Sequence, residues 1–364
     1  MAENNTIQTF RPAGRPTLIG SLPLTDYQEA LRWIFADTPE IPIWPQLPVA
    51  PAGGMLNQFV EGIPGVIEEA GRTYYSTEAP AFEEEQLKFY EEYLLASEEP
   101  TTLSSSARFQ VSRARAAGIY ELAEAARNKT GLVAIKAQIT GPFTQLTGIH
   151  DQQNRLGYYD ATIRDLVVKG LAMKAAWQVR FYKKNFPDLP VLLFIDEPAL
   201  AGLGSSAFIS VSLADLAQDL AELIIAVQDA GGLAGVHVCA NTDWSLLLAS
   251  AIDILSFDAY NFFDRFATCR QEIHGFLDRG GIIAWGLVPT GDEKNIRQET
   301  ADSLVALWEK QAAMLQGPDW DLPALLQQTL ITPSCGTGSL PAELARRVLS
   351  LTSEVAAALR KKYC

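Results

Sequence analysis

Apolar and polar positions follow a repeating order along the chain, in which short apolar runs alternate with longer amphipathic stretches. The apolar runs are predicted to be strands, at residues 17–21, 40–48, 131–142, 190–200, 233–240, 252–260, 280–290 and 325–336. Between most of them, apolar residues recur with the spacing of an amphipathic helix. These stretches are predicted to be helices, at residues 25–37, 82–97, 111–128, 160–185, 212–232, 299–315 and 341–362, with one more ending at Arg279.

About eight strand–helix units in a chain of 364 residues are typical of a single (β/α)8 TIM barrel. We therefore expect one α/β domain over residues 1–364. An open doubly wound sheet is the alternative, but no G-x-G-x-x-G follows the first strand and no P-loop lysine motif is present. A Gly-rich, irregular insertion at about residues 52–77 interrupts the pattern, and we predict a hairpin and loop near the active face there.

Three late strands end in residue types that bind metals. His237 and Cys239 follow one apolar run, Asp258 follows the next, and Cys335 follows the last. The carboxyl ends of barrel strands line the active face, so these side chains are expected to meet there. Thiolate, imidazole and carboxylate together suit zinc in tetrahedral geometry. The alternative is a set of ordinary buried thiols and a core histidine.

Two more strand ends carry candidate substrate contacts. Asp196 and Glu197 end a buried apolar run, where acids are costly to bury unless they meet a cation or an amine. We expect one of them to hold a substrate amino group, and a salt bridge at the barrel rim is the alternative. Gly20 permits close backbone approach and Ser21 can donate to a carboxylate, or they form a turn and a helix cap.

The composition limits the kinds of partner that the protein is expected to bind. The formal net charge is −14, which argues against nucleic acid and anionic membranes as partners. The polar start of the chain predicts no secretory signal, and no apolar run has the length of a membrane span. We therefore expect a cytoplasmic protein with reduced thiols. The remaining candidates are predicted to be incidental: Cys269, Cys364, His150 and His274.

The motifs LIGSLP, ITGPFT, FIDEPAL, HVC and SCG occur in this order along the chain. In this set the sequence resembles the catalytic barrel of cobalamin-independent methionine synthase, which belongs to the uroporphyrinogen decarboxylase-like superfamily. The resemblance covers nearly the whole chain. It implies a core-only form, without the family's N-terminal barrel, and a zinc-dependent transfer of a methyl group to the thiol of homocysteine.

The resemblance also implies a ligand set. His237, Cys239 and Cys335 would bind the zinc, and Asp258 stands where the family has a glutamate as fourth ligand. Aspartate is shorter by one methylene, so Asp258 either reaches the metal from a shifted backbone or lies one shell further out.

For the substrate, the resemblance implies that Asp196 binds the amino group of homocysteine. Ile19, Gly20 and Ser21 would contact the substrate through the backbone and the Ser21 hydroxyl.

Two departures from the family concern the methyl donor. The family has a tryptophan that stacks on the folate shortly after its T-G-P motif, whereas this segment reads PFTQLTGIH. The family's proton-donating histidine is missing from GLVPTGDEKN. A folate nitrogen leaves poorly without protonation, whereas Co(I) leaves a methyl-corrinoid without a proton. We therefore expect a methyl-corrinoid protein as the donor.

Three alternatives stay open at this point. Related core-only barrels methylate coenzyme M, although that thiol has no amine to pair with an acid. A uroporphyrinogen decarboxylase would require an Arg-rich pocket, and only Arg11 and Arg15 lie near the first strand. The third is a non-catalytic barrel that binds zinc or a corrinoid partner.

Overall fold

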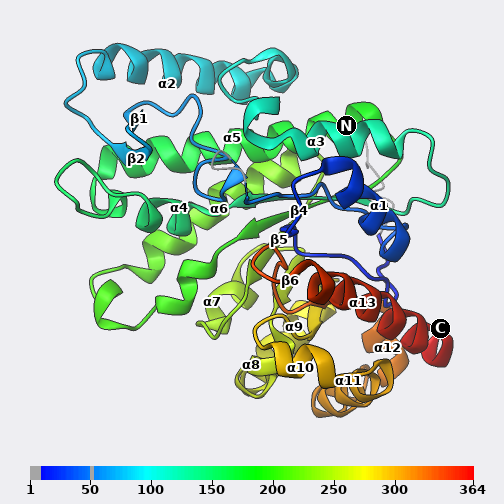
Figure 1. Cartoon of the computed structure of the whole chain (residues 1–364). Coiled ribbons are helices and arrows are strands. Elements are labelled where there is room, and N and C mark those ends of the chain that lie inside the picture. Colours follow the sequence, from blue (N-terminus) through cyan, green and yellow to red (C-terminus); the bar gives the residue numbers. More distant parts are fainter. Residues whose placement is uncertain (1–9, 50–52) are drawn as a thin grey trace, which may run out of the picture.

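Six parallel strands form one curled sheet at the centre of the protein (Figure 1). The structure is a computed structural model, and it describes residues 10–49 and 53–364. The strands are hydrogen-bonded in chain order, each to the next. Their bounds are β3 Ile135–Thr140, β4 Val191–Asp196, β5 Leu233–Val238, β6 Ile254–Phe257, β7 Ile282–Val288 and β8 Thr329–Pro333.

These strands are buried on both faces, which explains why they read as continuous apolar runs. Every residue of β3, β4, β6, β7 and β8 is buried. Parallel strands of this kind are covered by the helices that connect them. The sheet is thus a curled half-barrel of alternating strands and helices, with all carboxyl ends at one edge.

The first two predicted strands are extended segments and not regular strands. Single parallel bridges join Pro16 to Ile331 of β8, Ser21 to Gln46, and Ile43 to Lys136 of β3. The two segments thus lie between the outer strands of the sheet. In the second segment, prolines 42, 45 and 48 lack the backbone donor that a regular ladder needs. Where eight strands were expected, the structure therefore has a sheet of six strands and two bridged extended segments.

Helices form the outer layer, and long ones begin at sequence-encoded caps. The Asp160 side chain accepts hydrogen bonds from Thr162 N and Ile163 N at the start of α5, and Ser212 caps α6. The helix bounds are α1 Tyr27–Asp37, α2 Phe82–Glu98, α3 Arg113–Ala126, α4 Pro142–Gly148, α5 Ala161–Asn185, α6 Leu213–Asp229, α7 Trp244–Ala249, α8 Ala259–Phe266, α9 Arg270–Asp278, α10 Glu293–Gln298, α11 Ala301–Leu315, α12 Leu322–Gln327 and α13 Ala342–Tyr363. Short 3-10 helices lie between these elements, among them η2 at Pro100–Ser105 and η4 at Pro198–Gly202. None of the described helices is long and apolar enough to span a membrane.

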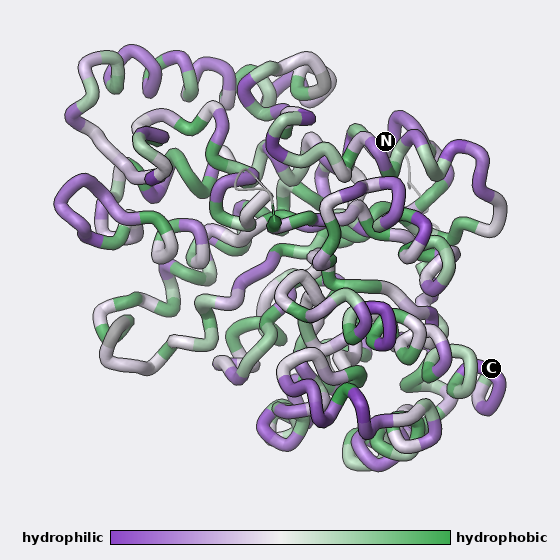
Figure 2. Tube along the Cα trace, in the orientation of Figure 1, coloured by the Kyte–Doolittle hydropathy of each residue, from purple (hydrophilic) through white to green (hydrophobic). Residues whose placement is uncertain are grey.

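The insertion contains the predicted hairpin. Strand β1, Val66–Glu69, pairs antiparallel with β2, Arg72–Tyr75, and Tyr75 at its end is fully buried. Residue 52, where the insertion was expected to begin, lies outside the described residues. Helix α2 follows and lies above the sheet in this view as a mostly polar element (Figure 2). The insertion and α2 therefore thicken one side of the half-barrel.

Candidate metal centre

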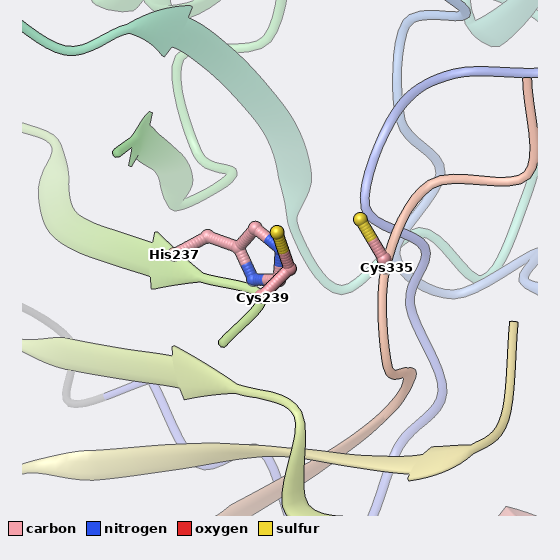
Figure 3. Close-up of side chains that lie close together, drawn as sticks. All are labelled: His237, Cys239 and Cys335. Carbon is pink, nitrogen blue, oxygen red and sulfur yellow. The ribbon is translucent and has the colours of Figure 1, made fainter. Parts of the chain in front are cut away.

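Three metal-ligating side chains meet at the carboxyl edge of the sheet. His237 is the second-last residue of β5, Cys239 directly follows the strand, and Cys335 lies in the segment after β8 (Figure 3). Their ligand atoms all lie within 4.8 Å of one another. Alternation in the extended chain places His237 and Cys239 on one side, as the sequence predicted. The structure thus brings together three of the four predicted ligands.

The orientation of His237 is fixed by its neighbour on the next strand. Its Nδ1 lies 2.9 Å from the Ser256 Oγ of β6. Its Nε2 is buried and has no hydrogen-bond partner among the described residues. A buried nitrogen without a partner is costly, and a metal-binding histidine commonly donates its other ring N–H to a fixing group. The imidazole therefore fits a metal ligand that coordinates through Nε2.

The two thiols influence each other strongly. The Cys335 thiol and His237 stabilise the thiolate of Cys239 and lower its pKa to about 4. The same contact with Cys239 raises the pKa of Cys335. The contact thus favours a thiolate at Cys239 and a protonated thiol at Cys335. A bound cation favours the deprotonated form of both, so the donor set fits a soft divalent metal such as zinc.

Asp258 is not part of this group. It caps helix α8, where its Oδ1 accepts from Asn261 N at 2.9 Å and its Oδ2 accepts from Asn261 Nδ2 at 2.7 Å. Burial raises the pKa of Asp258, and these two hydrogen bonds oppose the rise. Both carboxylate oxygens are therefore engaged by its own helix, and the aspartate lies beside the three ligands without joining them.

Asp196 is the buried acid that remains available. It ends β4 and lies beside His237 in the strand register. Its Oδ1 has no hydrogen-bond partner among the described residues. Burial raises the pKa of Asp196 to about 6, while His237 and Lys136 oppose the rise. An unpaired carboxylate oxygen at this place suits a cationic group of a ligand.

Glu197 has a different role from its neighbour. Its carboxylate accepts hydrogen bonds from Phe143 N at 2.9 Å, Thr144 N at 2.8 Å and Thr144 Oγ1 at 2.6 Å. It thereby caps the amino end of α4. A Cβ at Gly141 would lie 2.2 Å from the Glu197 Cδ, which explains the glycine there. The structure places Glu197 under the site, outside the residues that line the cavity.

The first extended segment forms part of the wall. Ile19 and Ser21 line the cavity, and a Cβ at Gly20 would meet the Gln46 side chain at 2.6 Å. The Ser21 Oγ accepts a hydrogen bond from Gly338 N at 3.2 Å, and its carbonyl accepts from Thr337 N at 2.9 Å. Ser21 thus anchors the loop after Cys335 as well as facing the cavity.

Sequence reasoning missed Lys136. This lysine is fully buried inside β3, where its Nζ donates to the Ile19 carbonyl at 2.9 Å and lies 4.1 Å from the centre of the Phe194 ring. Burial lowers the pKa of Lys136 to about 7, and Asp196 opposes the change. A single charged residue in an otherwise uncharged strand was the available signal. Lys136 supports the Ile19 segment from below.

A cavity of about 530 Å³ opens above these residues. Its walls include Ser21, Asp196, His237, Cys239 and Cys335, and most of the other lining side chains are apolar or small. Residues 48, 49, 53 and 55 close it on the side of the insertion. This volume is in the range of sites for small molecules.

The remaining cysteines and histidines lie away from this cavity. Cys269 lies 3.7 Å from Ser245 Oγ, Cys364 is exposed, and the His274 ring bonds to the Leu315 carbonyl. His150 forms a bridge with Leu156.

No protein-family model matches the sequence, and no curated protein matches it significantly. The site is therefore interpreted from its own geometry.

Proposed function

We propose that the protein is a zinc-dependent methyltransferase that moves a methyl group from a methyl-corrinoid protein to the thiol of homocysteine, giving methionine. The observation that carries the proposal is the group of His237, Cys239 and Cys335 at the floor of the cavity, with a buried, unpartnered Nε2. Three ligands leave one position of a tetrahedral metal for a substrate.

The chemistry follows from the acidity of thiols. A free thiol has a pKa of about 8.5 and is mostly protonated at neutral pH. When bound, zinc stabilises the thiolate of a substrate and so supplies a nucleophile at neutral pH. Ser256 fixes the orientation of the His237 ring, and most of the remaining cavity wall is apolar.

Asp196 supports an amino-acid thiol as acceptor. Its free carboxylate oxygen lies at the same cavity as the metal-ligating group and suits the ammonium of homocysteine. Coenzyme M has no ammonium, so it would leave this oxygen without a partner. Lys136, through the Ile19 carbonyl, holds the segment that ends in Ser21 at the opposite wall.

The donor is proposed from the residues of two loops. Neither the segment 142–150 nor the loop 286–295 contains a tryptophan or histidine that would hold and protonate a folate, apart from His150, which is bridged to Leu156. In transfer from a methyl-corrinoid, the thiolate sulfur forms a bond to the methyl carbon. The cobalt–carbon bond breaks and leaves its electron pair on cobalt as Co(I), so no proton donor is required.

We also propose that the two bridged segments complete an eight-stranded barrel around this site, because their pairs connect β8 to β3. The cavity lining argues against a uroporphyrinogen-type decarboxylase. That substrate carries many carboxylates, and no arginine lies among the described residues that line the cavity.

Zinc K-edge absorption on the purified protein, with and without homocysteine, tests the proposal. We expect a sulfur shell that gains one scatterer when homocysteine is added. A closed zinc shell that ignores thiols would favour a binding protein instead, and absence of zinc would contradict the mechanism. Methyl transfer to homocysteine is then compared between methylcobalamin and methyltetrahydrofolate. Equal turnover with both donors would contradict the assignment of the donor.

A further inference from the structure

A second cavity lies outside the sheet, in the helical layer. It has a volume of about 470 Å³ and lies between α2, η2, α5 and α6. It shares no lining residue with the metal centre. Its walls are mainly apolar and include Leu103, Ala172, Met173, Ala176 and Ile225. A cavity of this size is large enough for a small molecule.

One cation faces this apolar space without a partner. Arg180 lines the cavity from α5, and its Nε is buried without a hydrogen bond. Over residues 10–49 and 53–364, no ion pair of Arg180 is formed, whereas Arg164 on the same helix pairs with Asp215 and Asp219. Burial lowers the pKa of Arg180, and Asp229 opposes the change. Arg180 is half-buried, and a buried guanidinium nitrogen without a partner is costly unless an acceptor compensates it.

The acids of the cavity do not supply that anion. Glu222 accepts a hydrogen bond from the Tyr93 hydroxyl at 3.1 Å and lies 3.5 Å from Lys169. Asp229 is exposed at the end of α6 and interacts with Arg180 by electrostatic attraction without forming an ion pair. The cavity therefore combines apolar walls, one available guanidinium and an acidic rim.

We propose that this cavity is a binding site for a small molecule that carries a carboxylate on a compact apolar body. The carboxylate would pair with Arg180, and the apolar body would contact the alanines and Met173. Two sources share this chemistry. A simple aliphatic acid uses Arg180 alone, whereas an apolar α-amino acid also places an ammonium near Asp229. The site does not depend on the metal centre.

Hexanoate and L-norleucine test the proposal, because they differ only by the α-ammonium group. Binding to the full chain is measured by titration calorimetry in the presence of a metal chelator, which separates the result from the proposed methyl transfer. We expect saturable binding of at least one probe. Arg180→Gln should weaken it about tenfold or more, which is the usual loss for a charge-assisted hydrogen bond. Arg32→Gln, at an exposed arginine of α1, is the matched control and should bind as the wild type does.

A second variant fills the space. Ala221 lines the cavity from α6 and is half-buried, so Ala221→Leu should fold normally and weaken both probes. Tighter binding of norleucine would identify an amino acid as the ligand class, and tighter binding of hexanoate would identify a simple carboxylic acid. No saturable binding at millimolar concentrations, or binding that persists unchanged in both variants, would overturn the proposal.

Discussion

The ends of β4 and β6 offer a direct comparison, because each places an aspartate at the carboxyl edge of the sheet, near His237 and Cys239. Asp258 after β6 has both oxygens bonded to Asn261. Asp196 after β4 keeps one buried oxygen without a partner. The two aspartates are similarly buried, at 5% and 8% exposure, so burial alone does not distinguish them.

The difference teaches that an acid becomes a binding group when its hydrogen bonds are left open. Glu197, the direct neighbour of Asp196, is satisfied by three donors of α4 and so serves the fold. A buried polar atom without a partner is costly and is retained where a ligand completes it. Four predictions test this contrast, and they follow from the largest expected effect to the smallest.

Metal affinity separates the ligands from Asp258. We expect Cys239→Ala to lower zinc affinity more than 100-fold, because even outer partners of a metal ligand change affinity by about 10- to 100-fold. Asp258→Asn should retain the zinc, because the carboxylate is occupied by its own helix. Competition with a chromogenic chelator measures both. Cys269→Ala, at a half-buried cysteine elsewhere, is the control. Loss of zinc from Asp258→Asn would make Asp258 a fourth ligand.

The pH dependence of stability tests the burial of the Glu197 carboxyl group. Burial raises the pKa of Glu197 from its ordinary value of 4.5 to about 7. Between these values the folded protein binds more protons than the unfolded chain, so stability should fall as pH rises through this window. The full difference is about 3 kcal/mol. Urea unfolding at pH 5 and pH 8 should show a larger loss of stability in the wild type than in Glu197→Gln, because the variant keeps only the contribution of other buried acids such as Asp196.

Exposed Glu83 provides the control for that experiment. Glu83→Gln should keep the pH dependence of the wild type. If the wild type and Glu197→Gln lost the same stability between pH 5 and pH 8, Glu197 would not carry the effect.

Substrate discrimination tests the open oxygen of Asp196. Homocysteine and 4-mercaptobutanoate differ only by the amino group. Asp196→Asn should raise the KM for homocysteine about 10- to 100-fold, because a charge-assisted hydrogen bond is lost. The KM for 4-mercaptobutanoate should stay unchanged. Steady-state methyl transfer from methylcobalamin measures both values. An equal rise for the two thiols would assign Asp196 to the metal centre and not to the amino group.

The smallest change in zinc affinity is expected from a substitution in β6. Ser256→Ala removes the group that fixes the His237 ring, at 2.9 Å from its Nδ1. Zinc affinity should fall about tenfold, at the lower end for an outer partner of a ligand. Ser245→Ala changes a half-buried serine of α7 and should have no effect. An unchanged affinity in Ser256→Ala would show that the ring is held by packing alone.

Of the eight barrel strands predicted from the sequence, six are regular strands in the structure, and of the four predicted ligands, three lie together. Apolar runs identify buried parallel strands, and the residues that follow them share one edge. The roles of Glu197 and Asp258 could not be derived in this way, because they depend on which donors lie nearby. Asn261, three residues after Asp258, was a local signal for a cap. The partners of Lys136 and the isolation of Arg180 depend on segments far apart in the sequence.

The placement of Cys335 after the last strand has a consequence for biosynthesis. A chain that is still growing on the ribosome presents His237 and Cys239 long before Cys335 has been made. Pro16 likewise pairs with Ile331, so this contact can form only after β8 has been made. Complete loading with metal would therefore require a polypeptide made at least as far as Cys335, and a product shortened by proteolysis before β8 would carry only part of the site.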